Sequence, residues 1–154
     1  MKTLLLAVLL SSAFRDGARL PPLFTCDGEN VSPPLSWDGL PDGTKSLAVT
    51  LDDPDAPAGD WVHWVLYDVP PTPPRRTTGV GAGKEGKTWG VASFSKTGYQ
   101  GPCPPPGKPH RYVFTLFALS APTGLKPGAT RPQLLNAISA TTLGTATLTA
   151  TYGR

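Results

Sequence analysis

The chain has 154 residues, of which 39% are hydrophobic and 16% charged, and its formal net charge is +3. This length suits one domain over residues 1–154, and the apolar fraction is too high for a disordered chain. The 17 glycines and 19 prolines interrupt almost every helix-length window, which excludes a helical bundle. The basic residues are scattered, which argues against nucleic acid as a partner. No apolar run reaches the ~18 residues that cross a bilayer.

The first 13 residues allow two interpretations. One interpretation is a signal segment, which typically has a basic residue, an apolar run and small residues before its cleavage point. Here these would be Lys2, Leu4–Leu10 and the residues that end at Ala13. Such segments usually span ~15–30 residues, so this one would be short. The same apolar run, bounded by serine, is also typical of a buried first strand. We favour the retained strand and a cytoplasmic protein; a signal segment would instead place the protein in the periplasm or outside the cell.

Four further strands are predicted from stretches in which apolar residues either alternate with polar ones or run continuously, and which are rich in β-branched and aromatic residues. These strands are Ser46–Asp52, Trp61–Val69, Arg111–Leu119 and Thr141–Tyr152. The stretches 53–60, 70–87 and 97–109 between them are predicted to be loops. One short helix is predicted over Arg131–Ala140, with Thr130 as its N-cap. Together these elements predict a mainly β fold, a sandwich of antiparallel or mixed sheets with one or two short helices.

Polar residues are concentrated at the ends of three predicted strands. The two histidines of the chain, His63 and His110, each lie near the start of a strand that follows a loop rich in proline and glycine. Asp53 directly follows the strand 46–52, and Asp55 follows in the loop. Tyr112 is two residues beyond His110 and therefore shares its face of the strand. If the three strand ends are neighbours, these side chains converge on one cavity.

The residue types at these strand ends suit anion recognition. Imidazole rings donate N–H bonds and gain a positive charge near pH 6–7. A carboxylate orients one ring, while a tyrosine hydroxyl and loop amides add donors. Strict alternation along 61–69 would place His63 on the face that carries Val65 and Tyr67. A metal site built from the two histidines and Asp53 is an alternative, but no ligand spacing favours it.

The two cysteines, Cys26 and Cys103, lie far apart in loop-like contexts rich in proline or glycine. Neither has a second cysteine or a histidine at zinc-ligand spacing. Their sequence context alone is compatible with one disulfide that closes a long loop and with two separate thiols.

Several motifs, taken in order, resemble the phosphatidylethanolamine-binding proteins, and in particular their bacterial branch known as Raf-kinase-inhibitor-like. These motifs are Thr25–Trp37, Asp53–Pro57, Trp61–Trp64, Gly98–Gly107 and His110–Phe114. The resemblance extends from about residue 11 to the C-terminus. It departs from that branch at Ala92–Lys96, where an Asn-Asp pair is common. The chain also lacks the longer C-terminal helix of eukaryotic members, so their kinase regulation is not carried over.

The resemblance implies a β-sandwich with a small anion pocket near its surface. It implies non-enzymatic binding of phosphate or of phosphorylated head groups such as phosphorylethanolamine, without catalytic residues, cofactor or metal. The implied ligand-binding residues are Asp53, Asp55, Pro57, Trp61, His63, Pro104, Pro105, His110 and Tyr112. It also suggests that Cys26 and Cys103 form a disulfide, because both belong to motifs expected near each other.

Two other functions remain as alternatives. The first is a protein-interaction module that inhibits a protease or a kinase, for which Pro70–Pro74 could supply a rigid loop. The second is a weak hydrolase in which the histidines and Asp53 act as general acid and base. No nucleophile in a recognisable motif accompanies the histidines, which disfavours the hydrolase. A homodimer formed through an edge strand is a further possibility.

Overall fold

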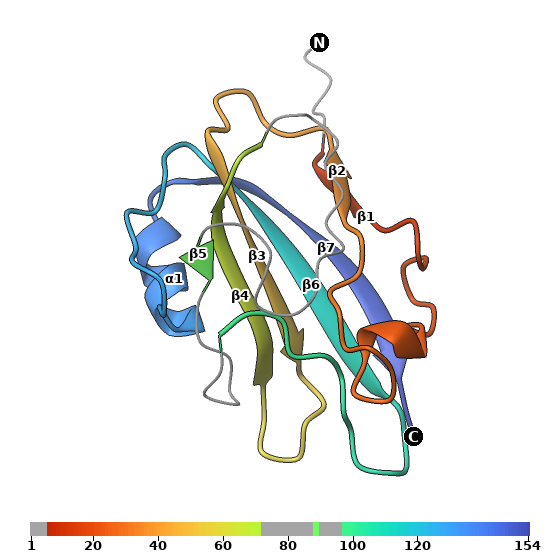
Figure 1. Cartoon of the computed structure of the whole chain (residues 1–154). Coiled ribbons are helices and arrows are strands. Elements are labelled where there is room, and N and C mark those ends of the chain that lie inside the picture. Colours follow the sequence, from red (N-terminus) through yellow and green to blue (C-terminus); the bar gives the residue numbers. More distant parts are fainter. Residues whose placement is uncertain (1–5, 72–87, 90–96) are drawn as a thin grey trace.

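The computed structural model of the protein describes residues 6–71, 88–89 and 97–154 (Figure 1). The predicted mainly β fold is confirmed. The elements in chain order are β1 (Val8–Leu10), a 3-10 turn (Pro22–Phe24), β2 (Ser36–Asp38), β3 (Ser46–Asp53), β4 (Trp61–Val69), β5 (Thr88–Trp89), β6 (His110–Leu119), α1 (Arg131–Ile138) and β7 (Thr142–Tyr152). The four longest predicted strands are all present, and their ends differ from the prediction by at most one residue.

The strands form two antiparallel sheets. The larger sheet has five strands in the order β5-β4-β3-β6-β7, and the smaller sheet pairs β1 with β2. Strand β3 is central in the larger sheet, and all its residues are buried. The sequence missed β2 and β5 because strands of three and two residues are too short to show a period. The apolar run at the N-terminus does contain a strand, at Val8–Leu10.

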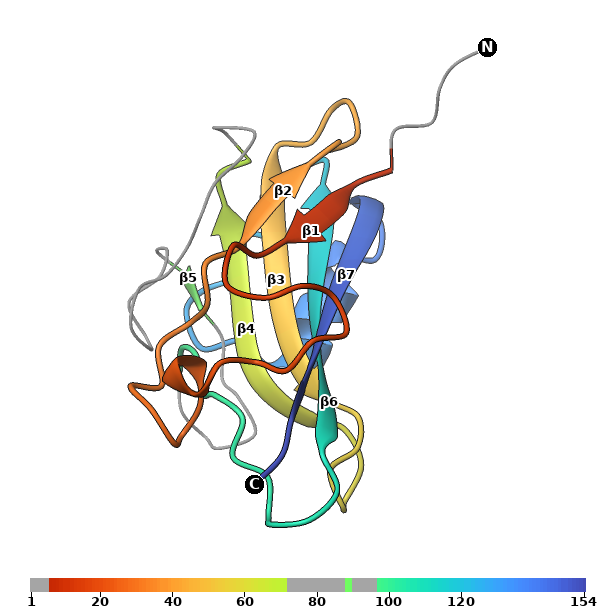
Figure 2. The same cartoon turned by 90° about the vertical axis from the view of Figure 1, so that its right-hand side faces the viewer.

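The two faces of the larger sheet are covered by different parts of the chain. The small sheet and the N-terminal loops lie over one face (Figure 2). There Leu9, Leu20 and Trp37 pack into the same apolar cluster as sheet residues such as Leu51 and Phe114. Helix α1 covers part of the opposite face, where its Leu134 and Ile138 pack against a second cluster. Burial of these two apolar clusters holds the layers together.

Helix α1 begins as predicted and ends earlier than predicted. Thr130 accepts a hydrogen bond from the amide of Gln133, and the Gln133 side chain accepts one from the Thr130 amide. This reciprocal capping box fixes the start of the helix. The helix was expected to reach Ala140 but stops at Ile138. The chain must turn there to enter β7, and the Thr141 amide and the Thr142 hydroxyl both donate to the Ile138 carbonyl.

Strand β4 contains an irregularity that the sequence did not reveal. Leu51 of β3 pairs with Trp64, whereas the next residue, Asp52, pairs with Val62. His63 is therefore an extra residue in β4, as in a β-bulge. A bulge reverses the side-chain alternation on one side of it, so assignments of faces by simple counting fail.

The predicted face of His63 was wrong for this reason. Val65 and Tyr67 belong to the cluster under α1. His63 instead contacts the ring of Tyr112, which belongs to the opposite cluster. The bulge thus turns His63 toward the same side as Trp64. This turn brings the ring to the end of the sheet where the candidate site lies.

Parts of several expectations fall outside the described residues. These are most of the predicted loop 70–87, including the end of the Pro70–Pro74 segment, and the whole of Ala92–Lys96. Within the described ranges, no helix has both the length and the apolar character needed to cross a membrane.

Candidate functional site

A cavity of about 280 Å³ lies where β3 ends and where β4 and β6 begin. This is the lower end of the larger sheet in Figure 1. The antiparallel pairing of β3 with both neighbours brings the three strand ends together, which meets the condition on which the convergence of these side chains depended. The lining residues are Asp53, Ala56, Pro57, Ala58, Trp61, His63, Cys103, Pro104, Pro105, His110 and Tyr112.

Asp53 and His110 form a hydrogen-bonded pair in this cavity. The Nδ1 atom of His110 lies 2.7 Å from Oδ2 of Asp53. Asp53 is 3% exposed, so its carboxylate is held away from bulk water. A carboxylate can only accept, so Nδ1 of His110 carries the proton and the tautomer is fixed. The opposite nitrogen, Nε2, is then the atom of the ring that changes from acceptor to donor when the ring is protonated.

His63 is anchored in a similar way, but to a backbone carbonyl. Its Nδ1 atom lies 2.6 Å from the carbonyl oxygen of Gln100, and the Gln100 amide donates to the His63 carbonyl at 2.9 Å. Nδ1 therefore carries a proton in this ring as well. Burial lowers the pKa of His63, and the Gln100 carbonyl opposes this shift. His63 is accordingly neutral at pH 7 in the unliganded protein.

Tyr112 lies between the two histidines. Its ring meets the His63 ring edge-on at 5.4 Å and stacks with the His110 ring at 6.4 Å, measured between ring centres. Burial and the negative charge of Asp53 raise the pKa of Tyr112. Its hydroxyl therefore remains protonated, and that proton is donated to the Asp53 carboxylate. The two imidazoles, the carboxylate and the phenol form one contiguous polar group.

Asp55 is the one predicted ligand-binding residue that does not line this cavity. Its carboxylate accepts hydrogen bonds from the backbone amide, Nε and Nη2 of Arg111, at 2.8–2.9 Å. These hydrogen bonds hold the pKa of Asp55 well below its usual range. The structure thus shows Asp55 fastening the 54–60 loop to the start of β6, which places Asp53 and His110 side by side.

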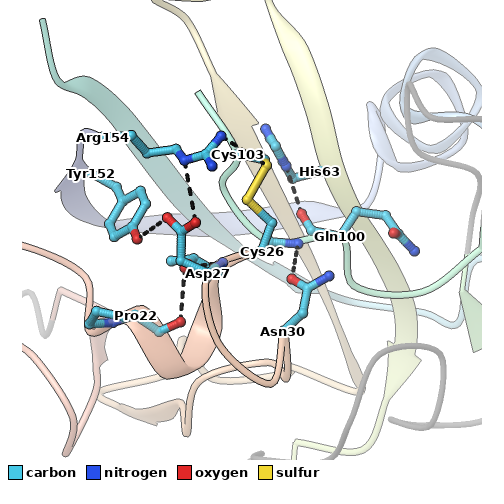
Figure 3. Close-up of a disulfide and its surroundings, with 11 residues drawn as sticks. Pro22, Cys26, Asp27, Asn30, His63, Gln100, Cys103, Tyr152 and Arg154 are labelled. Atoms are coloured by element: carbon cyan, nitrogen blue, oxygen red, sulfur yellow. Dashed lines mark hydrogen bonds and ion pairs between the residues drawn. A yellow bond between two sulfur atoms is a disulfide. The ribbon is translucent and has the colours of Figure 1, made fainter. Parts of the chain in front are cut away.

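Cys103 forms part of the cavity wall. It is joined to Cys26 by a disulfide (Figure 3). This disulfide joins the loop before β6 to the segment that follows the 3-10 turn. Two hydrogen bonds strengthen this junction, from the Cys26 amide to the Pro102 carbonyl and from the Gly101 amide to Oδ1 of Asn30. The same loop presents the Gln100 carbonyl to His63. The segment around Cys26 and Asn30 therefore supports the loop that orients His63.

The sequence therefore predicted most of the residues that the structure brings together. Eight of the nine predicted ligand-binding residues line the cavity, and Asp55 is the exception. The sequence contains no indication of the part of the wall formed by Ala56 and Ala58, because alanine carries no chemical signal. It also missed the Gln100 carbonyl, because a backbone acceptor is independent of residue type. Among the described residues, no cluster of three or more His, Cys, Asp or Glu could hold a metal ion.

Comparison with known proteins agrees with this architecture. Residues 10–153 match the family model of the phosphatidylethanolamine-binding proteins. A UPF0098 protein of Methanothermobacter thermautotrophicus is 46% identical over 149 residues, which cover 95% of this chain and 98% of that protein. The UPF0098 protein YbhB of Escherichia coli is 45% identical over 121 residues, covering 72% of this chain and 77% of YbhB.

Solved structures show the same similarity in three dimensions. The crystal structure of a phosphatidylethanolamine-binding protein homologue, CT736 of Chlamydia trachomatis, has a TM-score of 0.90 and 34% identity, covering 97% of this chain and 99% of the other. The E. coli protein YbcL, described as a member of the mammalian PEBP family, has a TM-score of 0.86 and 31% identity, covering 96% and 98%.

The fold, with its strand-end cavity, is thus that of a β protein with a small surface pocket. The chain belongs to the phosphatidylethanolamine-binding protein family, and its similarity to YbhB and YbcL supports the YbhB-type branch.

Proposed function

We propose that the protein binds small anions, phosphate or phosphorylated head groups, in the cavity lined by His63, Asp53, His110 and Tyr112, and that it does so without chemical turnover. The observation that supports this most strongly is the pair of histidines, each with Nδ1 tied to the protein by a hydrogen bond of 2.6–2.7 Å. Rings fixed in this way lose little freedom when a ligand binds, which favours affinity.

The charge balance of the cavity determines which ligands fit. Asp53 is negative and opposes an anion, but the proton on His110 Nδ1 lies directly against its carboxylate. A second proton, on Nε2 of His110, would turn this pair into a donor toward the ligand. The Tyr112 hydroxyl donates its proton to the Asp53 carboxylate and so offsets part of that negative charge. Apolar walls of proline and tryptophan exclude water and strengthen these hydrogen bonds.

The protonation state of His63 should control the anion affinity of the cavity. In the neutral ring Nδ1 holds the hydrogen, so Nε2 has a lone pair that an anionic oxygen cannot approach favourably. An anion gains from His63 only when the ring takes up a proton or when the ligand itself carries one. Because burial lowers the pKa of His63 in the unliganded protein, we expect binding to be accompanied by proton uptake.

An enzymatic function has less support among the residues that line the cavity. The His110–Asp53 pair could serve as an acid-base couple. However, no serine, threonine or lysine is among the lining residues, and the lining cysteine is in the disulfide. Turnover of a phosphate monoester or carboxylic ester that disappears in a His63→Ala variant would favour the hydrolase instead.

Calorimetric titration tests the proposal. We expect inorganic phosphate and O-phosphorylethanolamine to bind with a 1:1 stoichiometry at pH 6. Ethanolamine alone should not bind, because it lacks the anion that the donors recognise. A protein that binds none of these ligands at millimolar concentration would contradict the proposed function and would favour the protein-interaction alternative.

A further inference from the structure

The Cys26–Cys103 disulfide lies at the boundary between the cavity and the surface. Both cysteines are exposed, and Cys103 is one of the lining residues of the cavity. A dissolved thiol can therefore reach the bond without unfolding the protein.

A positive charge lies next to one of the two sulfur atoms. Nη1 of Arg154 is 3.9 Å from Sγ of Cys103, and Nε of Arg154 is 3.3 Å from Oδ1 of Asp27 (Figure 3). Asp27 also accepts a hydrogen bond from the Tyr152 hydroxyl. The guanidinium is thus held in place beside Cys103. A neighbouring guanidinium stabilises a thiolate.

Because Arg154 lies beside Cys103, the Cys103 sulfur is the better leaving group when the disulfide opens. A thiolate of a small dithiol attacks Sγ of Cys26 and forms a mixed disulfide there, and Cys103 leaves as the thiolate that Arg154 stabilises. The second thiol of the reagent then attacks its own sulfur in the mixed disulfide and releases Cys26. In total the protein disulfide gains two electrons and two protons, and the dithiol becomes a cyclic disulfide.

Opening the bond changes the cavity in two ways. It leaves the Cys103 thiol, beside Arg154, in the wall of a cavity proposed to hold an anion, where a thiolate would oppose binding. It also removes the covalent junction behind residues 99–103, which carry the Gln100 carbonyl that orients His63. Gly101 fits this junction closely, because a Cβ there would collide with the Phe24 carbonyl oxygen.

We propose that the Cys26–Cys103 disulfide is a thiol-exchange site that sets the anion affinity of the cavity: the oxidised protein binds, and reduction weakens binding. The inference rests on the proposed anion-binding function. By linkage, an anion that binds the oxidised form more tightly also makes the disulfide harder to reduce, by the same factor.

The test is a titration of inorganic phosphate at pH 7.5 into the oxidised protein and into protein reduced with dithiothreitol. We expect the dissociation constant to rise at least ~5-fold on reduction, from the added charge and the looser loop. The matched control is the Cys26→Ser/Cys103→Ser double variant, in which dithiothreitol should change nothing. A ligand-free measurement accompanies it: amide hydrogen exchange at Cys26 and Gly101 should become faster in the reduced protein.

The outcomes separate the two proposals. Equal phosphate affinity in the oxidised and reduced protein overturns the exchange-site proposal and leaves anion binding intact. A dithiothreitol effect that persists in the double variant also overturns it, since the effect would then not come from the disulfide. Binding of phosphate in neither state overturns the proposed function and this inference together.

Discussion

Phosphate affinity should fall roughly 10- to 150-fold when His110 or His63 is replaced by alanine, because each change removes a hydrogen bond to a charged ligand worth about 1.5–3 kcal/mol. The two losses should arise differently. His110→Ala removes the ring that balances the Asp53 carboxylate and leaves that buried charge facing the ligand. His63→Ala removes the ring that is held by the Gln100 carbonyl. Calorimetric titration at pH 6 measures both effects.

Two controls make this result specific. Arg15→Ala removes one exposed positive charge near β1, away from the cavity, and should change the affinity by no more than about twofold at physiological salt. Thermal unfolding of each variant shows whether the fold is retained, and His63→Gln offers a second substitution if His63→Ala unfolds. Undiminished phosphate affinity in a folded variant of either histidine would contradict the assignment of the site.

Trp64→Ala should cause a large loss of stability. Trp64 is fully buried, pairs with Leu51 across the sheet, and packs edge-on against Tyr99 at 5.4 Å between ring centres. Its removal leaves a large cavity directly behind the bulge that orients His63. We expect the free energy of unfolding to fall by about 3–5 kcal/mol, as measured by urea denaturation.

Trp61 provides a matched control for Trp64. The two tryptophans lie on the same strand, but Trp61 is only partly buried and lines the cavity. We expect Trp61→Ala to cost about 1 kcal/mol or less in stability, and to weaken phosphate binding instead by exposing the cavity to water. Equal losses of stability for the two substitutions would contradict the difference in burial between Trp64 and Trp61.

The sequence predicted the main strands because their patterns are long. The runs at 46–52, 61–69 and 111–119 are dominated by apolar and β-branched residues, and they appear as β3, β4 and β6. The approach of Asp53 to His110 was predicted only on the condition that the strand ends are neighbours, and the antiparallel pairing of β3 with β6 meets that condition. The family resemblance supplied the proline and tryptophan walls, for which the composition of the chain gave no independent signal.

The remaining features could not be read from local pattern. The bulge at His63 depends on the register between β3 and β4, and no residue type announces it. The carbonyl that anchors His63 is a backbone atom of Gln100. Asp55 has the same side chain as Asp53, but three hydrogen bonds from Arg111 turn it away from the cavity. Each of these features comes from tertiary contacts between residues far apart in sequence.

The most direct test of a histidine-built anion site is the affinity for sulfate at pH 6 and at pH 8. Sulfate does not change its protonation in this range, so any dependence on pH must come from the protein. Because the pKa of His63 is lowered in the unliganded protein and a bound anion raises it, the complex holds more protons, and affinity falls as pH rises. We predict binding at least ~5-fold tighter at pH 6. Equal affinity at the two pH values, or no binding at either, would contradict the account.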